Sequence, residues 1–437
     1  MITRFLTGAA CAALIGLSTP ALAVTSPELP GAPIQVSPSA VQAVDAFYAS
    51  RGGSPVWLRS GADSNAAREL IGLLERAPLD GLESGPALAL QAQDLIVRAQ
   101  SGDKTALEAA DRLLSVAWVS YVQDLQRPPS GMIYADSWAS PRRDSPMQTL
   151  QRAATAPSLV AYVRSVSEVN PLYAQLRDAG WAQMQSDGGQ IDPRVLTSLD
   201  RAREHPFQSK YVMVDAAAAR LYMIEDGQIV DSMKVVVGKA GPNTQTPMLG
   251  STIYYATLNP YWHVSDDLVQ SLIAKNVLSQ GLGYLKTHGY QVMPADSNDD
   301  QLLDPAKVDW HAVAAGALKV RVRELPGPAN SMGRVKFGFP NAWDIYLHDT
   351  PVKELFAQDD RDLSHGCIRL QDAERLARWM LGRNPQAVPG EPEQNVTLPT
   401  PVPIYVTYLT AQAHDGQLSY VDDIYGRDSQ SEVAALR

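Results

Sequence analysis

The 437-residue sequence predicts an α+β fold in which a helical N-terminal half precedes a β-rich C-terminal half. Apolar residues recur with a helical period over residues 40–205. Near residue 210 the pattern changes to short strand-like runs bounded by turn residues. Helical patterns return at residues 265–320 and interrupt the strands. The length suggests two or three domains, and 45% hydrophobic with 19% charged residues is typical of folded proteins.

Residues 1–23 have the layout of a secretory signal peptide, because Arg4 precedes an apolar run that ends near Ala21-Leu22-Ala23. This layout predicts cleavage after Ala23 and export to the periplasm. The apolar run is shorter than the ~20 residues that span a membrane. No later segment is long and apolar enough, so we expect no transmembrane segment after cleavage. Residues 24–39 are rich in Pro and Ser, which predicts a linker.

Residues 40–205 have the pattern of a helical domain. The longest apolar stripe follows a candidate N-cap at Asp103 and contains Leu107, Ala110, Leu114, Trp118, Tyr121 and Leu125. A stripe at this spacing usually forms a core. This half contains no cysteine, and no histidine before His205, so we interpret it as a scaffold domain without a catalytic site.

Residues 206–437 have the pattern of a second, β-rich domain. We expect strands at 211–214, 220–224, 230–237, 252–258, 318–322, 345–348 and 402–409, and a helix at 372–381. Residues 265–320 break this series with two helical patterns, one after a candidate N-cap at Ser265 and one near Asp304. We interpret 265–320 as a helical lid inserted in the β-domain.

Cys367 is the single cysteine that remains once Cys11 leaves with the signal peptide. A lone thiol forms no intramolecular disulfide, and by composition alone an inert, buried cysteine is the commoner case. The surrounding Ser364-His365-Gly366-Cys367-Ile368-Arg369 favours a nucleophile instead. Gly366 permits a sharp turn, and Arg369 brings positive charge to the side of the chain that carries Cys367.

Two histidines are candidate bases for this thiol. His365 is near in sequence, but a residue two positions away in extended chain lies about 7 Å off. His348 lies 19 residues upstream at the end of a predicted strand. A strand end beside a turn is a common way to bring a base to a nucleophile, so the spacing favours His348 and leaves His365 open.

The combined pattern resembles the YkuD-type L,D-transpeptidase catalytic domain. It contains His348-Asp349-Thr350 followed by Ser364-His365-Gly366-Cys367-Ile368-Arg369. Further segments over residues 205–430 are similar to the larger periplasmic YcbB-like branch: Asn259-Pro260-Tyr261-Trp262, Pro326-Gly327-Pro328, Gly333-Arg334-Val335-Lys336-Phe337, Phe339-Pro340-Asn341 and Asp422-Asp423-Ile424-Tyr425-Gly426-Arg427-Asp428. Residues 40–205 resemble the scaffold domain of that branch more weakly.

The resemblance implies a role for each matching residue. Cys367 is the nucleophile, His348 is the general base, and the backbone carbonyl of Asp349 orients the imidazole. The backbone N–H groups of Gly366 and Cys367 form the oxyanion hole. The residues implied to bind substrate or line the site are Ser364, His365, Arg369, Tyr261 and Trp262, and Trp262 is equally a candidate core aromatic.

The implied activity is peptidoglycan cross-linking. A cysteine thioester forms on a donor stem peptide, and an amine of an acceptor stem resolves it into a 3→3 cross-link. Other cell-wall synthesis proteins are further candidate partners, and carbapenems acylate many enzymes of this family. The alternatives are a peptidoglycan hydrolase, a lipoprotein-attaching or D-amino-acid-exchanging enzyme on the same fold, and a non-catalytic cell-wall scaffold protein.

Several features weigh against other functions. The formal net charge of −10, without a run of Lys or Arg, disfavours nucleic acid as a partner. Asp309, His311 and the aspartates at 359–362 have no metal-ligand spacing, and Gly238-Lys239 is no phosphate loop, so we expect no metal and no cofactor.

The sequence departs from the family pattern at two places. Residues 172–205 are too few for a peptidoglycan-binding repeat, and Ser265-Asp266-Asp267 stands where Val-Pro is usual.

Overall fold

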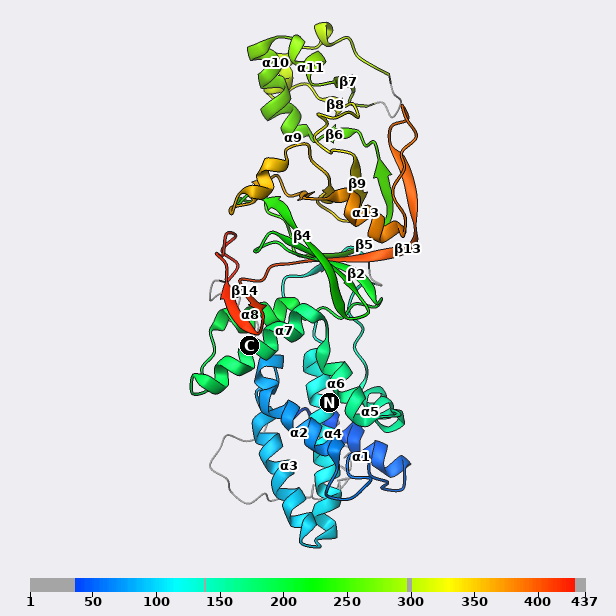
Figure 1. Ribbon diagram of the computed structural model, residues 1–437, viewed down its shortest axis with the longest axis vertical. Coiled ribbons are helices and arrows are strands. Elements are labelled where there is room, and N and C mark those ends of the chain that lie inside the picture. Colours follow the sequence, from blue (N-terminus) through cyan, green and yellow to red (C-terminus); the bar gives the residue numbers. More distant parts are fainter. Residues whose placement is uncertain (1–35, 137–138, 297–300, 429–437) are drawn as a thin grey trace, which may run out of the picture. The chain divides into compact units, whose positions relative to one another are not determined.

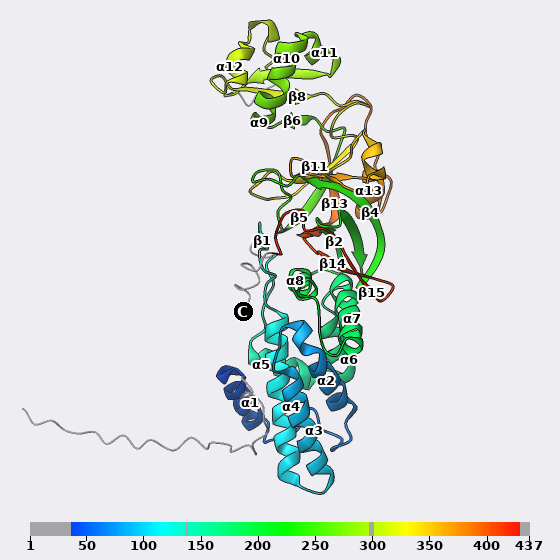
Figure 2. The ribbon, with the colours of Figure 1, turned by 90° about the vertical axis from the view of Figure 1, so that its left-hand side faces the viewer.

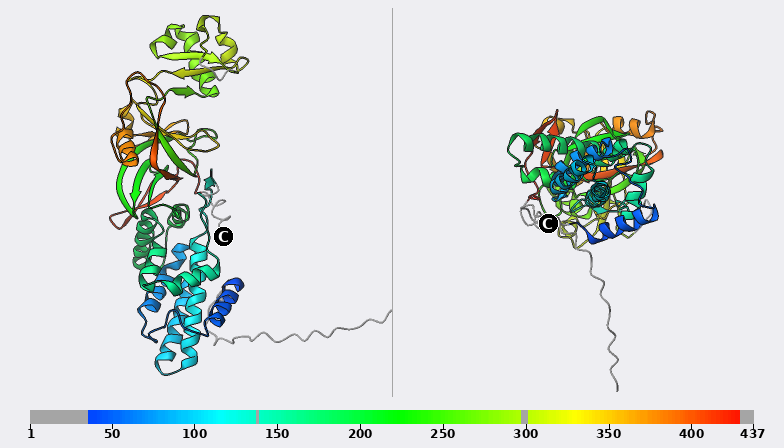
Figure 3. Two further views of the ribbon diagram at one scale, coloured as in Figure 1. Left: turned by 90° about the vertical axis from the view of Figure 1, so that its right-hand side faces the viewer. Right: turned by 90° about the horizontal axis from the view of Figure 1, so that it is seen from below.

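Six of the eight helices in the N-terminal half begin at a residue whose side chain caps them. The computed structural model describes residues 36–136, 139–296 and 301–428, so the expected signal peptide lies outside the described residues, as does most of the expected linker. The helices are α1 (Pro38–Ser50), α2 (Asn65–Arg76), α3 (Gly85–Gln100), α4 (Lys104–Leu125), α5 (Pro146–Thr155), α6 (Leu159–Glu168), α7 (Pro171–Ser186) and α8 (Pro193–Ala202), with a 3₁₀ turn η1 at Ala77–Asp80 (Figures 1 and 3). Side-chain oxygens of Ser64, Asp103, Ser145, Ser158, Asn170 and Asp192 accept first-turn N–H groups of α2 and α4–α8.

Helix α4 is the predicted apolar stripe. Asp103 caps it by accepting a hydrogen bond from the N–H of Ala106. The stripe from Ala110 to Leu125 is fully buried, whereas Leu107 is half-buried at the helix start. Helix α1 begins at Pro38, which places the last two residues of the expected linker inside a helix. The prediction of a helical N-terminal half followed by a β-rich half is confirmed.

The C-terminal half is built on one large sheet. Its strands are β1 (Ile133–Tyr134), β2 (Lys210–Asp215), β3 (Arg220–Glu225), β4 (Gln228–Gly238), β5 (Leu249–Leu258), β9 (Val335–Gly338), β10 (Tyr346–His348), β11 (Asp362–Ser364), β12 (Ile368–Leu370) and β13 (Gln394–Thr407). The order is β1-β5-β13-β2-β3-β4-β12-β10-β9, with β11 beside β4. A further pairing of β9 with β5 closes the ring of strands. Strand β1 comes from residues expected to belong to the scaffold domain, and it pairs with β5 through Ile133 and Tyr134.

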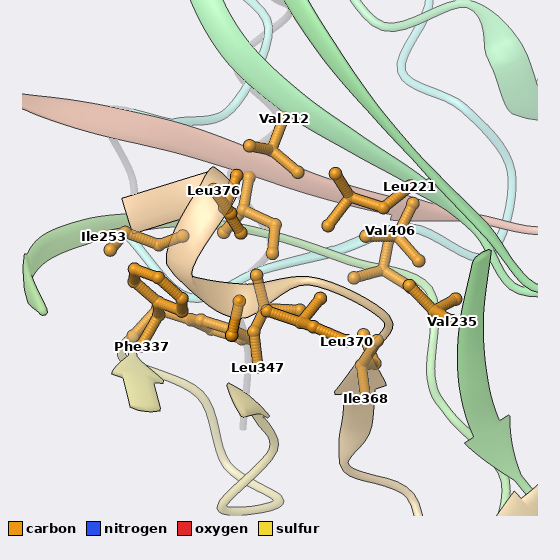
Figure 4. Close-up of a cluster of buried hydrophobic side chains, with 14 of the residues drawn as sticks. Val212, Leu221, Val235, Ile253, Phe337, Leu347, Ile368, Leu370, Leu376 and Val406 are labelled. Carbon is orange, nitrogen blue, oxygen red and sulfur yellow. The ribbon is translucent and has the colours of Figure 1, made fainter. Parts of the chain in front are cut away.

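Helix α13 (Ala373–Leu381) covers the core of this sheet. Asp372 caps it by accepting from the N–H of Arg375, and the helix agrees with the one predicted at 372–381. Figure 4 shows the buried cluster around Leu376, with side chains from strands on both sides of the ring. The labelled residues that contribute to this cluster are Val212, Leu221, Val235, Ile253, Phe337, Leu347, Ile368, Leu370 and Val406.

The insertion between β5 and β9 has a sheet and a core of its own. Strands β6 (Trp262–Val264), β8 (Val320–Glu324) and β7 (Tyr290–Pro294) pair antiparallel in that order, as Figure 1 shows. Figure 2 shows the same insertion turned by 90°. Its helices are α9 (Asp266–Leu268), a π-helical stretch Val269–Ala274, α10 (Lys275–Gln280), α11 (Gly283–Thr287) and α12 (Trp310–Ala314), with a 3₁₀ turn η3 at Pro305–Lys307.

The insertion corrects two expectations. The strand predicted at 318–322 exists as β8, but it pairs with β6 and β7 and not with the main sheet. Local alternation shows that a segment is extended, whereas its partner depends on residues far away in the chain. Ser265 occupies the N-cap position of α9, but its side chain makes no capping hydrogen bond.

The remaining elements are η4 (Lys353–Ala357) and a C-terminal hairpin of β14 (Ala411–His414) and β15 (Gln417–Tyr420). Among residues 36–136, 139–296 and 301–428, no helix is both long and apolar enough to cross a membrane.

Candidate active site

The alternation of β9, β10 and β12 separates a core face from a polar face. Phe337, Leu347 and Ile368 point into the core (Figure 4). Their sequence neighbours therefore project from the opposite face of the sheet, because successive side chains of a strand alternate. This polar face carries Lys336 from β9, Tyr346 and His348 from β10, and Arg369 from β12, with Cys367 directly before β12.

Strand register brings Cys367 and His348 together. Strands β10 and β12 are parallel, with Leu347 beside Ile368 and His348 beside Arg369. One step back along both strands places Tyr346 beside Cys367. Neighbouring strands are about 4.8 Å apart, so Cys367 and His348 lie on adjacent strands and on the same face. The histidine favoured by the spacing is thus the one that shares a face with the thiol.

His348 is a neutral, oriented imidazole. Its Nδ1 atom lies 2.6 Å from the backbone carbonyl oxygen of Asp349, the contact that the family resemblance implies. A carbonyl only accepts, so Nδ1 carries the hydrogen and Nε2 is left with a free lone pair. Burial, followed by the charge of Arg369, lowers the pKa of His348 from its usual 6.5 to about 3. The ring is therefore unprotonated at neutral pH and is available as a base.

Cys367 is a half-buried thiol with several hydrogen-bond contacts. Its Sγ atom lies 3.7 Å from the carbonyl oxygen of Asp344, to which the thiol donates. The backbone N–H and the hydroxyl of Tyr346 both hydrogen bond to the sulfur. Burial raises the pKa of the Cys367 thiol, and the bonds from Tyr346 with the charges of Lys336 and Arg369 partly offset this rise. The resting pair is thus a neutral thiol beside a neutral imidazole.

Tyr346 is a site residue that the sequence interpretation missed. Burial, followed by the sulfur of Cys367, raises the pKa of Tyr346 well above its usual value, so the hydroxyl remains a hydrogen-bond donor. Its ring lies 5.6 Å from that of His348 in an edge-on arrangement. The signal that could have found it is the strand period, since a residue two positions before His348 shares its face.

The turn before Cys367 is fixed by its own hydrogen bonds. Ser364 Oγ accepts from the N–H of Gly366 at 3.1 Å and donates to the carbonyl of Cys367 at 2.6 Å. Thr246 Oγ1 donates to the carbonyl of Gly366 at 2.8 Å. Gly366 has φ +111°, and a Cβ there would lie 2.8 Å from Ile345 Cδ1. A glycine is therefore required at this position by both conformation and space.

The turn gives Gly366 and Ser364 other roles than those that the family resemblance implies. The N–H of Gly366 is already bonded to Ser364, so in this conformation it is not free for an oxyanion. The N–H of Cys367, by contrast, donates to no residue within the part of the chain that the structure describes. Ser364 is buried and holds the turn, so it does not line a substrate surface. Motif spacing could not show this, because the bonds depend on how the turn folds.

The other residues predicted to bind substrate lie further apart from one another in the structure. His365 is exposed and Arg369 is half-buried. The N–H of Tyr261 donates to Glu393 Oε1 at 2.7 Å, and the Arg323 guanidinium lies 4.2 Å from its ring centroid. Trp262 packs against the apolar core of the insertion, which is the core role named above as its alternative. Across the described ranges, no group of three or more His, Cys, Asp or Glu side chains is arranged to hold a metal.

The side chain of Asp349 anchors the carbonyl that orients His348. Its carboxylate accepts from Lys353 Nζ at 2.6 Å and from the N–H of Arg334 at 2.9 Å. Its own N–H donates to the carbonyl of Val335 at 2.8 Å. Gly333 has φ +60° and lies so close that a Cβ there would overlap the Asp349 carboxylate. Asp349 is therefore held by the loop before β9, by β9 itself through Val335, and by Lys353 of the later segment Lys353–Ala357.

A Gly333→Ala substitution is expected to displace Asp349 and to slow acylation of Cys367. The added methyl overlaps the carboxylate and strains a positive φ, which costs about 1–3 kcal/mol of folding stability. Misplacing the carbonyl of Asp349 disorients His348, and we expect acylation to fall roughly tenfold or more. Thermal unfolding and carbapenem acylation rates measure the two effects. Gly327→Ala is the matched control, since a Cβ there meets no atom within 4 Å. Equal rates for the two variants would contradict the role given to Asp349.

Comparisons with known proteins agree with this geometry. Residues 209–404 match the YkuD L,D-transpeptidase catalytic domain, and residues 42–179 match a scaffold domain. A Haemophilus influenzae protein named "Putative L,D-transpeptidase" is 26% identical over 401 residues, which cover 89% of this chain and 79% of that protein.

Solved structures show weaker similarity. An L,D-transpeptidase from Mycobacterium smegmatis is 15% identical with a TM-score of 0.23, covering 45% of this chain and 58% of that one. L,D-transpeptidase 3 from Mycobacterium tuberculosis, in complex with a faropenem-derived adduct, is 14% identical with a TM-score of 0.23, covering 45% and 60%. This chain thus spans less than two thirds of those solved chains. This chain therefore has a YkuD-type L,D-transpeptidase catalytic domain at residues 209–404, which follows a scaffold domain at residues 42–179.

Proposed function

We propose that this protein is a peptidoglycan L,D-transpeptidase that works through a thioester on Cys367. The observation that carries this proposal is the pairing of a neutral His348, oriented by the Asp349 carbonyl, with the Cys367 thiol on the same sheet face. A buried imidazole with a free Nε2 and an adjacent thiol form the arrangement that nucleophilic catalysis requires. The predicted signal peptide supports a periplasmic location, where peptidoglycan is the substrate.

The chemistry begins with proton transfer. Nε2 of His348 takes the proton of Cys367 as the sulfur attacks the carbonyl that links the third and fourth residues of a donor tetrapeptide stem. The N–H of Cys367 is the donor that stabilises the oxyanion, while the hydroxyl of Tyr346 hydrogen bonds to the sulfur. The C–N bond then breaks, the terminal D-amino acid takes the proton from His348, and a thioester remains on Cys367.

The second half of the reaction transfers the acyl group. The amine of an acceptor stem attacks the thioester, His348 accepts the amine proton, and the sulfur leaves with a proton to restore the thiol. The product is a 3→3 cross-link. Water, a free D-amino acid or a lipoprotein amine in place of the stem amine would give hydrolysis, exchange or protein attachment from the same thioester.

Incubation with purified sacculi, followed by muropeptide analysis, tests this function. We expect 3→3 cross-linked dimers to increase and one D-amino acid to be released for each dimer formed. A Cys367→Ala variant should leave the muropeptide profile of the sacculi unchanged. Loss of tetrapeptides with new tripeptide monomers and no dimers would indicate a hydrolase. Unchanged muropeptides with the unmodified protein would refute the proposal.

A further inference from the structure

Two cations flank the thiol and the imidazole on the polar face. Arg369 lies beside His348 in the strand register, and Lys336 lies beside it on the other side, on β9. The Lys336 Nζ atom lies 4.4 Å from the ring centroid of Tyr346. The Lys336 side chain therefore extends over β10, the strand beside Cys367. In a chain of net charge −10, this face has a locally positive character.

The charges of Lys336 and Arg369 are not neutralised by a carboxylate in the part of the chain that the structure describes. Among the described residues, no carboxylate forms an ion pair with Lys336 or Arg369. Other cations of this domain are paired, such as Lys353 with Asp349 and Arg375 with Asp231. Both charges also oppose protonation of His348. A half-buried cation without an anion beside a reactive centre indicates that the anion arrives with the substrate.

We propose that Lys336 is a specificity-determining residue that binds a free carboxylate of the donor stem peptide. This inference rests on the proposed donor acylation and extends it to substrate recognition. A tetrapeptide donor has two free carboxylates near the attacked carbonyl: the C-terminal one on the leaving D-amino acid, and one on the side chain of a diamino acid at position three. The ammonium of Lys336 suits either carboxylate, and it meets the substrate on the side of His348 away from Cys367.

The position of Lys336 allows its role in binding to be separated from its effect on the base. The pKa of His348 is about 3, so loss of one nearby positive charge leaves the imidazole neutral at pH 7. An effect of Lys336→Met at pH 7 therefore does not arise through protonation of His348. Lys336 also lowers the pKa of the Cys367 thiol, and the loss of that effect is the same for every donor peptide. Methionine also keeps an apolar stem over the ring of Tyr346, which limits the structural change.

The experiment measures acylation of Cys367 by three synthetic donor tetrapeptides at pH 7. One carries both free carboxylates, one is amidated at the C-terminus, and one is amidated at the side-chain carboxylate. For Lys336→Met we expect kcat/KM to fall about tenfold to a hundredfold with the unmodified peptide, mainly through KM. The loss caused by Lys336→Met should be much smaller with the peptide that lacks the recognised carboxylate, which identifies its source.

Lys319→Met is the matched control for the loss of one positive charge, because Lys319 pairs with the exposed Asp266 on the insertion. It should behave as the wild type with all three peptides. An equal loss for Lys336→Met with every peptide, or no loss with any, overturns the carboxylate assignment while acylation stands. A wild-type protein that forms no adduct with the unmodified peptide overturns both this inference and the proposed function.

Discussion

A Cys367→Ala variant will form no covalent adduct with a carbapenem or with a donor tetrapeptide. Cys367 is the thiol that shares the polar face with His348 and accepts the hydrogen bonds of Tyr346. Removal of a catalytic nucleophile lowers turnover by on the order of 10⁴-fold or more, because the remaining groups cannot form the covalent intermediate. Intact-mass measurement of the protein after incubation with each compound reports the adduct directly.

Gly327→Ala is the control for this experiment, since a Cβ there meets no atom within 4 Å. It should acylate as the unmodified protein does. A Cys367→Ser variant keeps an oxygen nucleophile of much higher pKa, so its adduct should form far more slowly. Normal adduct formation in either Cys367 variant would exclude this residue as the nucleophile.

A His348→Ala variant will lose roughly 10²–10⁴-fold in the rate of acylation at pH 7. In the unmodified protein the thiol is protonated at this pH, because burial raises its pKa, and in the proposed mechanism His348 is the base that removes its proton. Without the imidazole, thiolate forms only by loss of the proton to solvent. Stopped-flow or mass-resolved acylation rates as a function of pH measure this difference.

The pH profile of acylation separates removal of the thiol proton by His348 from its loss to solvent. With His348 present, the pKa of about 3 keeps the base unprotonated, so the rate should be nearly level from about pH 5 to pH 7 and fall only as pH approaches that pKa. In His348→Ala the rate should instead rise about tenfold per pH unit, up to the pKa of the thiol. An acid limb near pH 6.5 in the unmodified protein would show that His348 is not the buried neutral base described above.

His365→Ala is the control for the base assignment. His365 lies closer to Cys367 in sequence, but its side chain is exposed and the structure gives it no contact with the thiol in the described region. We expect a small decrease, from altered support of the Ser364–Cys367 turn, with an unchanged pH profile. If His365→Ala abolishes acylation and His348→Ala does not, the two histidines must exchange roles.

The scaffold half contributes directly to the catalytic sheet. Strand β1 adds to β5, and the ring of Tyr134 lies against Gly250, where an added Cβ would lie 2.6 Å from the ring. The Tyr134 hydroxyl donates to Glu204 at 2.6 Å, and burial raises the pKa of this glutamate to about 7. The helical half is thus joined to the edge of the sheet by the pairing of β1 with β5 and by the packing of the Tyr134 ring on Gly250.

Residues close together in the sequence encode the local elements, and the motif spacing identifies the chemical partners. The stripe on α4 with Asp103 as its cap, and helix α13 with Asp372, follow from residues within a few positions of each other. Cys367 and His348 were recognisable because the family motif preserves their spacing. Gly366 was recognisable as a turn residue, since its positive φ is a local property.

Which groups meet, and how each is used, depends on the folded chain. The pairing of β8 with β6 and β7, and the position of Tyr346 beside the sulfur, depend on strand register between distant segments. The N–H of Gly366 is engaged by Ser364, which removes it from the predicted oxyanion hole. The pKa of His348 sums burial with the charges of Arg369 and Lys336. Local sequence encodes periodicity and turns, whereas burial, register and electrostatics depend on residues that become neighbours only after the chain has folded.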